Sequence, residues 1–363
     1  MKYIIAGGGT GGHIYPAIAI ARAILRKDAA ADILFVGANG KMEMEKVPKE
    51  GFKIIGLDIA GFNRSNVLKN ITLPFKIWKS RQKALQILKS FKPDIVIGVG
   101  GFASFPMLNA AQSLNIPTLI QEQNSYAGKT NKIIGKKAKS ICVAYDNMEQ
   151  FFPKDKIVKT GNPVRDVIVE QTVSKNEALQ FWKLDDTKLT VLVIGGSLGA
   201  KTINESIAAG LEQIINKGVQ VIWQTGKLYK ETGASLADKY KGSVLASEFI
   251  YEMDKAYAAA DIVVSRAGAL SIAELCIVAK PTVFVPYPFA AEDHQTSNAM
   301  ALVNKDAAWI VKDADANSDL VPKLLQLIDQ KQIRETMKHN ISKLGVSDAD
   351  DRIVNEIFKI IQK

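Results

Sequence analysis

The sequence predicts an α/β protein with two doubly wound parallel-sheet domains. Its 363 residues exceed the length of one ordinary domain. Short, continuous apolar runs alternate with helical patterns, which is typical of parallel strands that helices cover on both faces. The segments YIIAGGGTGGHIYP (3–16) and LTVLVIGGSLGAKT (189–202) each lead from an apolar strand through a glycine-rich turn into a helix. Two such openings indicate two similar domains of the nucleotide-binding type.

The first half is expected to hold seven strands separated by helices. The helix over 16–27 has apolar residues on one face, at intervals of three and four positions. The tripeptide 161–163, Gly-Asn-Pro, follows the last strand and is a turn signal. We therefore expect a hinge there and domains over 1–163 and 164–363. The predicted strands are Tyr3–Ala6, Ile33–Gly37, Lys53–Asp58, Ile95–Gly98, Thr118–Gln121, Ile141–Tyr145 and Ile157–Thr160.

The second half is expected to hold five strands, with a helix over 201–216 after its glycine-rich turn. A last helix over about 350–361 could pack on either domain. Residues 95–121 carry no charge, but glycines and prolines interrupt them, so they predict strand, loop, helix and strand rather than a membrane span. The predicted strands are Thr190–Ile194, Gln220–Gln224, Val244–Ala246, Ile262–Ser265 and Thr282–Pro286.

Basic residues are concentrated in the first half. Residues 1–163 hold 24 Lys and Arg against 11 Asp and Glu, whereas 164–363 hold 23 against 26, which together give the net charge of +10. Residues 59–93 hold eight basic residues, no acidic residue and several interleaved apolar ones. This pattern fits either an anionic membrane surface as partner or a solvated helix face whose apolar side is core. Nucleic acid is not expected, because no nucleic-acid-binding motif accompanies the charge.

The chain is poor in residues that bind metals or form disulfides. Cys142 and Cys276 lie in apolar runs, which predicts buried, reduced thiols. With three histidines and no cysteine cluster, a structural zinc site is not expected. The Asp-x-Asp sequences at 313–315 and 348–350 lie in polar stretches, so we interpret them as solvated helix caps rather than as a metal site.

The first glycine-rich loop fits the dinucleotide pattern only in part. Gly7, Gly9 and Gly12 satisfy G-x-G-x-x-G, but Ala-Asn-Gly (38–40) follows the second strand where a dinucleotide domain has an acidic residue. Neither loop has the Gly-Lys-Ser/Thr of a Walker A motif. Because the acidic residue after the second strand is missing, a dehydrogenase is disfavoured. The loops predict either backbone anion sites at helix N-termini, for phosphate or diphosphate, or tight turns without a ligand.

His13 ends the first loop, at the start of a helix. The helix dipole there favours the neutral imidazole, which can accept a proton. His13 is thus the best candidate for a general base among the three histidines. The alternative role is a helix-capping residue.

Seven motifs occur in order over essentially the whole chain: GGGTGGHIYPAIAIA (7–21), GVGGFASFP (98–106), QEQNSYAGKTNK (121–132), GNPVR (161–165), GGSLGA (195–200), SRAGALSIAEL (265–275) and HQTSNA (294–299). Together they resemble those of the MurG family of bacterial N-acetylglucosaminyltransferases. The resemblance implies a GT-B fold, in which two Rossmann-like domains face a cleft. It implies transfer of GlcNAc from UDP-GlcNAc to the 4-hydroxyl of MurNAc in undecaprenyl-pyrophosphoryl-MurNAc-pentapeptide (lipid I), with inversion, to make lipid II for peptidoglycan.

The resemblance also implies residue roles. Glu274 would accept the ribose hydroxyls, Arg165 would face donor phosphate, and Ser197 would bind the diphosphate. Ile250 would offer backbone groups to uracil, and Gln295 would contact sugar hydroxyls. His13 would take the acceptor proton. The implied UDP-GlcNAc-binding residues are Thr10, Gly11, Gly12, Asn124, Arg165, Ser197, Ile250, Ala269, Leu270, Ser271, Ile272, Ala273, Glu274 and Gln295.

A lipid-linked acceptor implies work at the membrane. The expected location is the cytoplasmic face of the inner membrane, as a peripheral protein, with other cell-wall synthesis proteins as possible partners. No metal or other cofactor is expected to be essential, because helix dipoles and donor side chains would stabilise the leaving UDP. The expected membrane patch is Leu73, Phe75, Ile77, Trp78 and Lys79.

Two departures and two alternatives remain. The family often has histidine where Gln121 stands. Because glutamine cannot accept the proton, His13, or a carboxylate such as Glu122, is left as the candidate base. The family also often has glutamine where Thr296 stands, which puts one sugar contact in doubt. A UDP-GlcNAc 2-epimerase would share the donor site but leave the basic patch unexplained. A non-catalytic module that binds sugar nucleotides or polyanions at a membrane would show no turnover.

Overall fold

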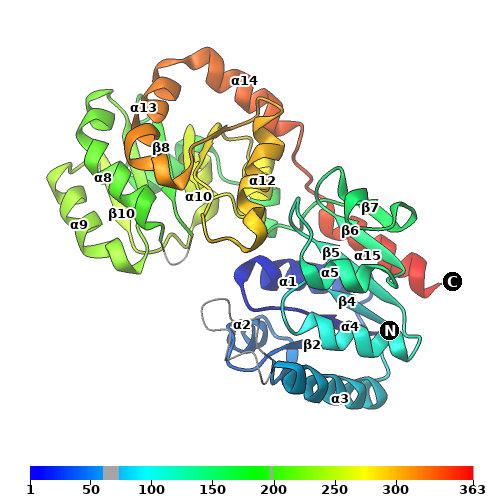
Figure 1. Cartoon of the computed structure of the whole chain (residues 1–363). Helices are drawn as coiled ribbons and strands as arrows, with labels where there is room; N and C mark the ends of the chain where they lie inside the picture. Colours follow the sequence, from blue (N-terminus) through cyan, green and yellow to red (C-terminus); the bar gives the residue numbers. More distant parts are fainter. Residues whose placement is uncertain (60–72, 197–198, 363) are drawn as a thin grey trace. The chain divides into compact units, whose positions relative to one another are not determined.

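The computed structural model describes residues 1–59, 73–196 and 199–362. The chain divides into two compact units, Met1–Val164 with Asp348–Lys363, and Arg165–Ser347. The change of unit falls directly after the Gly-Asn-Pro turn at 161–163. The last helix belongs with the first unit, a point that the sequence left open (Figure 1).

Unit 1 is built on a seven-stranded sheet in which every paired strand is parallel, with the order β3-β2-β1-β4-β5-β6-β7. β1 lies between β2 and β4, so the direction of winding reverses there. The loops that follow β1 and β4 therefore lie at the switch point, where open α/β sheets bind ligands. All seven predicted strands are confirmed. They are β1 (Lys2–Ala6), β2 (Asp32–Ala38), β3 (Lys53–Leu57), β4 (Ile95–Gly98), β5 (Thr118–Glu122), β6 (Ser140–Val143) and β7 (Ile157–Lys159).

Helices cover both faces of this sheet. Side chains alternate along each strand, so Ile4 joins one core cluster with α3 and α4, whereas Tyr3 and Ile5 join the other with α1 and α15. Two 3-10 turns, Met148–Gln150 and Lys154–Lys156, precede β7. The α-helices of unit 1 are α1 (Gly11–Lys27), α2 (Glu43–Lys49), α3 (Leu73–Phe91), α4 (Ser104–Ser113), α5 (Lys129–Gly135) and α15 (Ala349–Ile361).

The C-terminal helix α15, red in Figure 1, packs against α1 of unit 1. Its residues Ile353, Val354 and Ile357 are completely buried in the cluster around β1. Arg26 of α1 forms an ion pair with Asp350 at the start of α15. The prediction that Asp350 is a solvated cap is therefore wrong, because this carboxylate is buried beside its arginine partner.

Unit 2 has a six-stranded parallel sheet with the order β10-β9-β8-β11-β12-β13. Its switch point lies between β8 and β11, so the loops after these strands are the ligand-facing ones. The five predicted strands are confirmed. β13 was not predicted, since its two residues are too few for a pattern. The strands are β8 (Thr190–Ile194), β9 (Gln220–Gln224), β10 (Val244–Ser247), β11 (Ile262–Ser265), β12 (Thr282–Phe284) and β13 (Trp309–Ile310).

Helices pack on both faces of the second sheet as two apolar clusters. Gly210 of α8 lies so close to Val321 of α13 that a Cβ atom would come within 2.6 Å of the valine side chain. The α-helices are α6 (Asp166–Glu170), α7 (Lys175–Trp182), α8 (Lys201–Asn216), α9 (Lys230–Lys239), α10 (Met253–Ala259), α11 (Ala269–Ile277), α12 (His294–Val303), α13 (Ala316–Asp329) and α14 (Lys331–Ser342), with 3-10 turns at Lys227–Tyr229, Ala291–Asp293 and Asp313–Asp315.

Two further expectations concern thiols and the membrane. Cys142 and Cys276 are buried and unpaired, as predicted. Among the residues that the structure describes, no helix combines the length and the apolar character that crossing a bilayer demands.

The α1–α15 contact leads to a stability prediction. Ile357→Ala should lower the free energy of unfolding of unit 1 by about 2–5 kcal/mol, because it leaves a cavity in a closed core. Urea unfolding checks this value. The matched control is Arg352→Ala on the exposed face of α15, which loses only an i,i+4 pair with Asp348 and should cost less than about 0.5 kcal/mol. Equal effects of the two variants would show that α15 contributes no core.

Candidate active site

The two loops at the switch point of unit 1 pack backbone against backbone. The Gly8 N–H donates to the Gly100 carbonyl over 3.2 Å. A Cβ atom on Gly101 would lie 2.1 Å from the Gly8 carbonyl oxygen, and Gly101 has a φ of +87°. Only glycine fits this position, because a side chain would both clash and strain the backbone. The approach of these loops fixes the start of α1.

Glu43, which the sequence analysis missed, fixes the glycine-rich loop through hydrogen bonds to its backbone. Its buried carboxylate accepts the Gly9 N–H at 2.8 Å and the Ala38 N–H at 2.9 Å. A Cβ atom on Gly8 or Gly37 would come within 2.5 Å of this side chain. Glu43 is thus an acidic residue at the end of the second strand, where a dinucleotide domain has one. Its carboxylate binds backbone N–H groups of the protein itself and is not available for a ribose. The N–H groups of Gly11 and Gly12, in the first turn of α1, are the ones suited to an external anion.

His13 lies at the junction of the two loops. Its Nδ1 is 3.1 Å from the Gly8 carbonyl oxygen and 3.2 Å from the Thr10 hydroxyl. Because a carbonyl only accepts, the Gly8 contact assigns the proton to Nδ1 and makes Nε2 the basic nitrogen. A Cβ atom on Gly100 would lie 2.9 Å from Nε2, so the bare backbone of Gly100 makes room for the ring. This arrangement suits a general base.

The end of β5 orders a third loop of unit 1. The buried carboxylate of Glu122 accepts from the backbone N–H and side-chain amide of Asn124, from the Gly128 N–H and from the Asn131 amide. Burial raises the pKa of Glu122, and these hydrogen bonds oppose the rise. Gln121 is also buried, in contact with Gln123 and Asn162. Glu122 therefore positions Asn124, and its four donors leave it little capacity to act as a base.

In unit 2, Glu274 of α11 is the centre of a buried polar cluster. Its Oε1 accepts from Arg165 Nε at 2.9 Å and forms an ion pair with Arg165 Nη2 at 2.8 Å, and its Oε2 accepts from the Tyr257 hydroxyl at 3.1 Å. Burial raises the pKa of Glu274, while Arg165 and then the Tyr257 hydrogen bond lower it. Sequence analysis assigned both Arg165 and Glu274 to the donor site but did not predict that they form an ion pair with each other. Tyr257 was missed because it lies in an ordinary apolar helix pattern.

Three further parts of the predicted donor site, Ile250, residues 269–273 and Gln295, follow the carboxyl ends of β10, β11 and β12 in the second sheet. The Ile250 N–H donates to the Gln224 side chain at 3.0 Å, and the Ile250 side chain is buried. Gln295, in α12, accepts the Tyr287 N–H at 2.9 Å. Residues 269–273 form the first turns of α11, whose N-cap is Gly268. Ser197 lies outside the described residues.

Arg266 and Asp313 form an ion pair beside these loops. The Arg266 guanidinium also donates to the carbonyls of Val285 and Pro286, at 3.0 and 3.1 Å. Asp313 accepts from the Thr202 hydroxyl of α8 as well. The prediction that Asp313 is a solvated cap is therefore wrong, because it ties the loops after β11 and β12 to α8. Over the described ranges, no group of three or more His, Cys, Asp or Glu side chains is placed to hold a metal ion.

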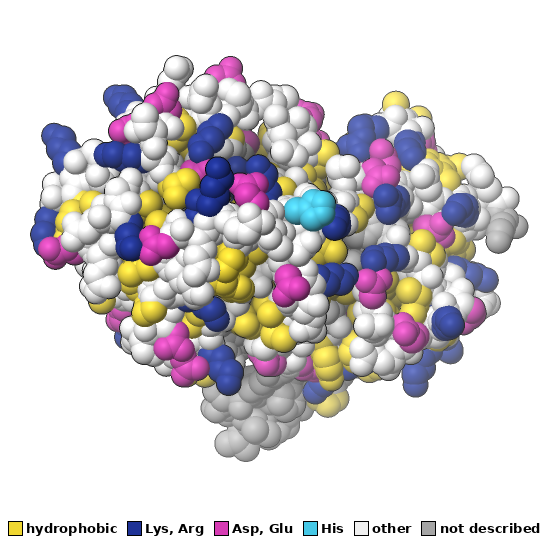
Figure 2. All heavy atoms as spheres, turned by 90° about the horizontal axis from the view of Figure 1, so that it is seen from above, with side chains coloured by type: hydrophobic (Ala, Val, Ile, Leu, Met, Phe, Trp, Pro, Cys, Tyr) yellow, Lys and Arg dark blue, Asp and Glu magenta, His cyan; other side chains and the backbone are white. Residues whose placement is uncertain are grey.

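The expected membrane patch falls on α3. Phe75 and Trp78 are 64% and 57% exposed, and their rings stack with centroids 5.9 Å apart. Lys79 is exposed, but Ile77 packs against the core cluster of unit 1 and is a poor candidate for insertion. Leu73 begins α3, and its side chain lies outside the described part of the structure. Figure 2 shows a face on which basic and acidic side chains are interspersed, so the net positive charge does not cover the surface uniformly.

Two protein-family domains match most of the chain. Residues 3–143 match the glycosyltransferase family 28 N-terminal domain, and residues 190–353 match the glycosyltransferase family 28 C-terminal domain. The chain is 53% identical over 363 residues to the UDP-N-acetylglucosamine--N-acetylmuramyl-(pentapeptide) pyrophosphoryl-undecaprenol N-acetylglucosamine transferase of Parabacteroides distasonis. This alignment covers 100% of this chain and 99% of that protein. The chain is also 53% identical over 360 residues to the protein of the same name from Cytophaga hutchinsonii, covering 99% and 97%.

Solved structures agree with the fold. The crystal structure of MurG from Acinetobacter baumannii matches with a TM-score of 0.81 and 31% identity over 99% of both chains. The UDP-GlcNAc 2-epimerase from Neisseria meningitidis matches with a TM-score of 0.66 and 17% identity, over 99% of this chain and 100% of that chain, which is a likeness of fold alone. The GT-B fold that the motifs implied is confirmed.

The contact between His13 and Gly100 can be tested directly. Gly100→Ala should displace the imidazole and shift its NMR resonances, which are readily assigned in a chain with three histidines. The control is Gly40→Ala. Gly40 also has a positive φ, +71°, but a Cβ atom there meets nothing within 4 Å. Both variants place alanine at a positive φ, which costs roughly 1–2 kcal/mol, so the control accounts for this kind of strain. A shift of the His13 resonances in both variants, or in neither, would contradict the contact.

Proposed function

The chain belongs to glycosyltransferase family 28, and from this premise we propose how its residues share one transfer reaction. The chain is an N-acetylglucosaminyltransferase that moves GlcNAc from UDP-GlcNAc to the 4-hydroxyl of MurNAc in lipid I, and so makes lipid II for peptidoglycan. The observation that carries this conclusion is full-length similarity to relatives whose names state this activity.

We assign donor binding to the switch-point edge of unit 2. A carboxylate offers about four acceptor positions. Arg165 Nε takes one of those on Glu274 and Tyr257 takes another, and Arg165 Nη2 lies 2.8 Å from the oxygen that accepts from Nε. We propose that Arg165 moves away from Glu274 as the ribose hydroxyls bind. The same movement makes the Arg165 guanidinium available to a donor phosphate. Ribose binding by Glu274 and phosphate binding by Arg165 therefore both depend on breaking the ion pair between them.

The other donor residues keep their proposed roles with one refinement. The Ile250 N–H already has Gln224 as acceptor, so its carbonyl is the group proposed for uracil. Gln295 is proposed to contact sugar hydroxyls. The rest of the proposed set is Thr10, Gly11, Gly12, Asn124, Ser197 and Ala269–Ala273.

His13 is proposed as the base. Nε2 takes the proton of the acceptor hydroxyl as this oxygen attacks the anomeric carbon, while the Gly8 carbonyl holds the Nδ1 proton. The bond from the anomeric carbon to the UDP oxygen breaks, and negative charge grows on the diphosphate. We propose that the N-termini of α8 and α11 and the Arg165 guanidinium, all in unit 2, stabilise this charge. We therefore propose that the reaction needs no metal ion.

A lipid-borne acceptor has to be met at a membrane. We propose that the exposed Phe75–Trp78 pair, with Lys79 beside it, enters an anionic bilayer surface, and that the enzyme works at the cytoplasmic face of the inner membrane. Stacked aromatic rings beside basic side chains combine the apolar burial and the electrostatic attraction that peripheral attachment requires.

A transfer assay tests the catalytic assignment. With UDP-GlcNAc and a short-chain lipid I analogue in the presence of EDTA, His13→Ala should lower kcat by about 10²–10⁴-fold. Glu274→Gln should mainly raise the donor KM, and His339→Ala, on exposed α14, should behave as wild type. Wild-type turnover of His13→Ala would remove the proposed base. Conversion of UDP-GlcNAc to UDP-ManNAc without acceptor would indicate an epimerase instead, and loss of activity in EDTA would contradict the metal-free mechanism.

Vesicle binding tests the membrane assignment. Replacing Phe75 and Trp78 together by Ser should weaken co-sedimentation with phosphatidylglycerol vesicles at least tenfold, because it removes the apolar part of the contact. The control is Phe181→Ser, an exposed aromatic residue of unit 2. The double variant should keep the wild-type melting temperature, because both rings are largely exposed. Unchanged vesicle binding would exclude α3 as the contact.

A further inference from the structure

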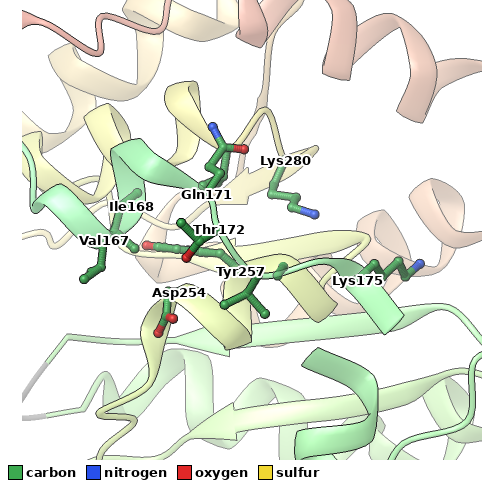
Figure 3. A pocket seen from close by; sticks show the side chains of 11 residues that line it. Val167, Ile168, Gln171, Thr172, Lys175, Asp254, Tyr257 and Lys280 are labelled. Carbon is green, nitrogen blue, oxygen red and sulfur yellow. The ribbon is translucent and has the colours of Figure 1, made fainter. Parts of the chain in front are cut away.

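A pocket in unit 2 has no role in the reaction described above. It has a volume of about 210 Å³ and lies between α6, the start of α7, α10 and the turn before β12 (Figure 3). Polar and apolar side chains share its walls. Val173, Val278 and the ring of Tyr257 are among the apolar ones, and Gln171 and Thr172 are among the polar ones. Sites for drug-sized ligands have roughly 300–1,000 Å³, so this pocket suits a smaller molecule.

The pocket has a cationic side. Lys280 lines it, and its Nζ donates to the Ala260 carbonyl at 2.7 Å. Within the described part of the chain, no carboxylate forms an ion pair with Lys280. Burial lowers the pKa of Lys280 to about 8, which Asp261 opposes, whereas Lys175 and Lys338 add to the lowering. Asp261 is already paired with Lys175. A buried ammonium group in such surroundings gains from an anion placed beside it.

The opposite side of the pocket restricts the charge of that anion. Asp254 also lines the pocket, and Figure 3 shows Asp254 on one side of Tyr257, with Lys280 and Lys175 on the other. A carboxylate wall disfavours a multiply charged ligand such as phosphate or a dicarboxylate. The apolar part of the lining, from Val173 and Val278, can accept a compact hydrocarbon body between the two charged sides.

We propose that this pocket is a second ligand site, which binds a small monocarboxylate with a compact apolar body. The carboxylate pairs with the Lys280 ammonium, and the apolar body packs between Tyr257 and Val278. The bound carboxylate supplies the charge partner that Lys280 lacks.

The site is coupled to the donor site. This part of the inference rests on the proposed function of Glu274. Tyr257 forms a wall of the pocket and donates its hydroxyl to Glu274. Arg165, the other partner of Glu274, is the N-cap of α6, whose Val167 and Ile168 line the pocket. A ligand that moves α6 changes the position of Arg165, and one that moves Tyr257 changes the other partner of Glu274. Either movement changes the affinity for UDP.

A structural role for Lys280 is the competing explanation. Its ammonium group donates to the carbonyl of Ala260, the C-cap residue of α10, where a positive charge stabilises a helix end. In that role Lys280 affects stability, and small anions leave it unaffected. The experiment has to separate these two roles.

The probe is sodium benzoate, titrated calorimetrically into the full-length protein without any sugar nucleotide, with neutral benzamide and inorganic phosphate as comparisons. We expect benzoate to bind at least tenfold more tightly than either. Lys280→Met should weaken benzoate binding at least tenfold, and Lys331→Met, an exposed lysine on α14, should leave it unchanged. Because Lys280→Met removes a buried hydrogen bond, the second variant is Thr172→Phe, which fills the pocket from an exposed position and keeps Lys280.

The outcomes separate the site from its coupling. Equal binding of benzoate and benzamide, or wild-type benzoate affinity in folded Lys280→Met or Thr172→Phe, would overturn the site. The site also fails if phosphate binds as tightly as benzoate. A separate titration of UDP with and without saturating benzoate should show at least a threefold change in affinity, reciprocal between the two ligands. Unchanged UDP affinity would overturn the coupling. Benzoate binding needs no turnover, so failure of the proposed transferase activity would leave the result on the site intact.

Discussion

The close approach of backbone to backbone between each glycine-rich loop and the loop after a neighbouring strand is the constraint on which both sites depend. In unit 1 a Cβ atom on Gly101 would lie 2.1 Å from Gly8, and in unit 2 a Cβ atom on Gly199 would lie 2.4 Å from the Thr225 carbonyl oxygen. Each contact brings two loops to the distance at which helix N-termini and side chains can meet one ligand. The glycines are therefore required for packing before they can serve in binding. The position of His13 is a consequence of the first of these contacts.

Buried carboxylates hold these loops in place. Glu43, Glu122 and Glu274 are all buried, and each accepts hydrogen bonds from groups distant in sequence or at loop ends. An ionised carboxylate in a low-dielectric interior is stable only when its acceptor positions are filled. Backbone and side-chain N–H groups from nearby loops bind the carboxylates of Glu43 and Glu122, so these two residues keep the loops in a fixed position. Glu274 depends instead on Arg165, whose side chain is 42% exposed, and this partner is the one that can leave.

The sequence predicted the sheets well because a parallel strand buried on both faces is recorded locally as an apolar run. β13 is the exception, since two residues carry no period. The candidate site was predictable only where motifs placed polar residues at strand ends. Glu43 lies in a helix five residues beyond β2 and reaches back to the glycine loop, which no local pattern records. Asp313 and Asp350 were misjudged for a related reason, because their arginine partners lie 47 and 324 positions away.

In the described part of α3, few basic side chains lie close enough to Phe75 and Trp78 to attract an anionic membrane. Of the basic residues in the described part of the 59–93 cluster, Arg81 donates to Asn109 and Ser113, and Lys83 donates to the Gly56 carbonyl. Lys89 lies 14 residues beyond Phe75 on the same helix, about 21 Å away at 1.5 Å per residue. Two exposed lysines, Lys76 and Lys79, remain beside the aromatic pair. At about 1 kcal/mol each, they contribute roughly a 30-fold preference for an anionic surface, which is too weak for stable attachment. On this part of α3 the apolar burial of Phe75 and Trp78 has to provide the larger share of the binding free energy, and the lysines select the charge of the lipid.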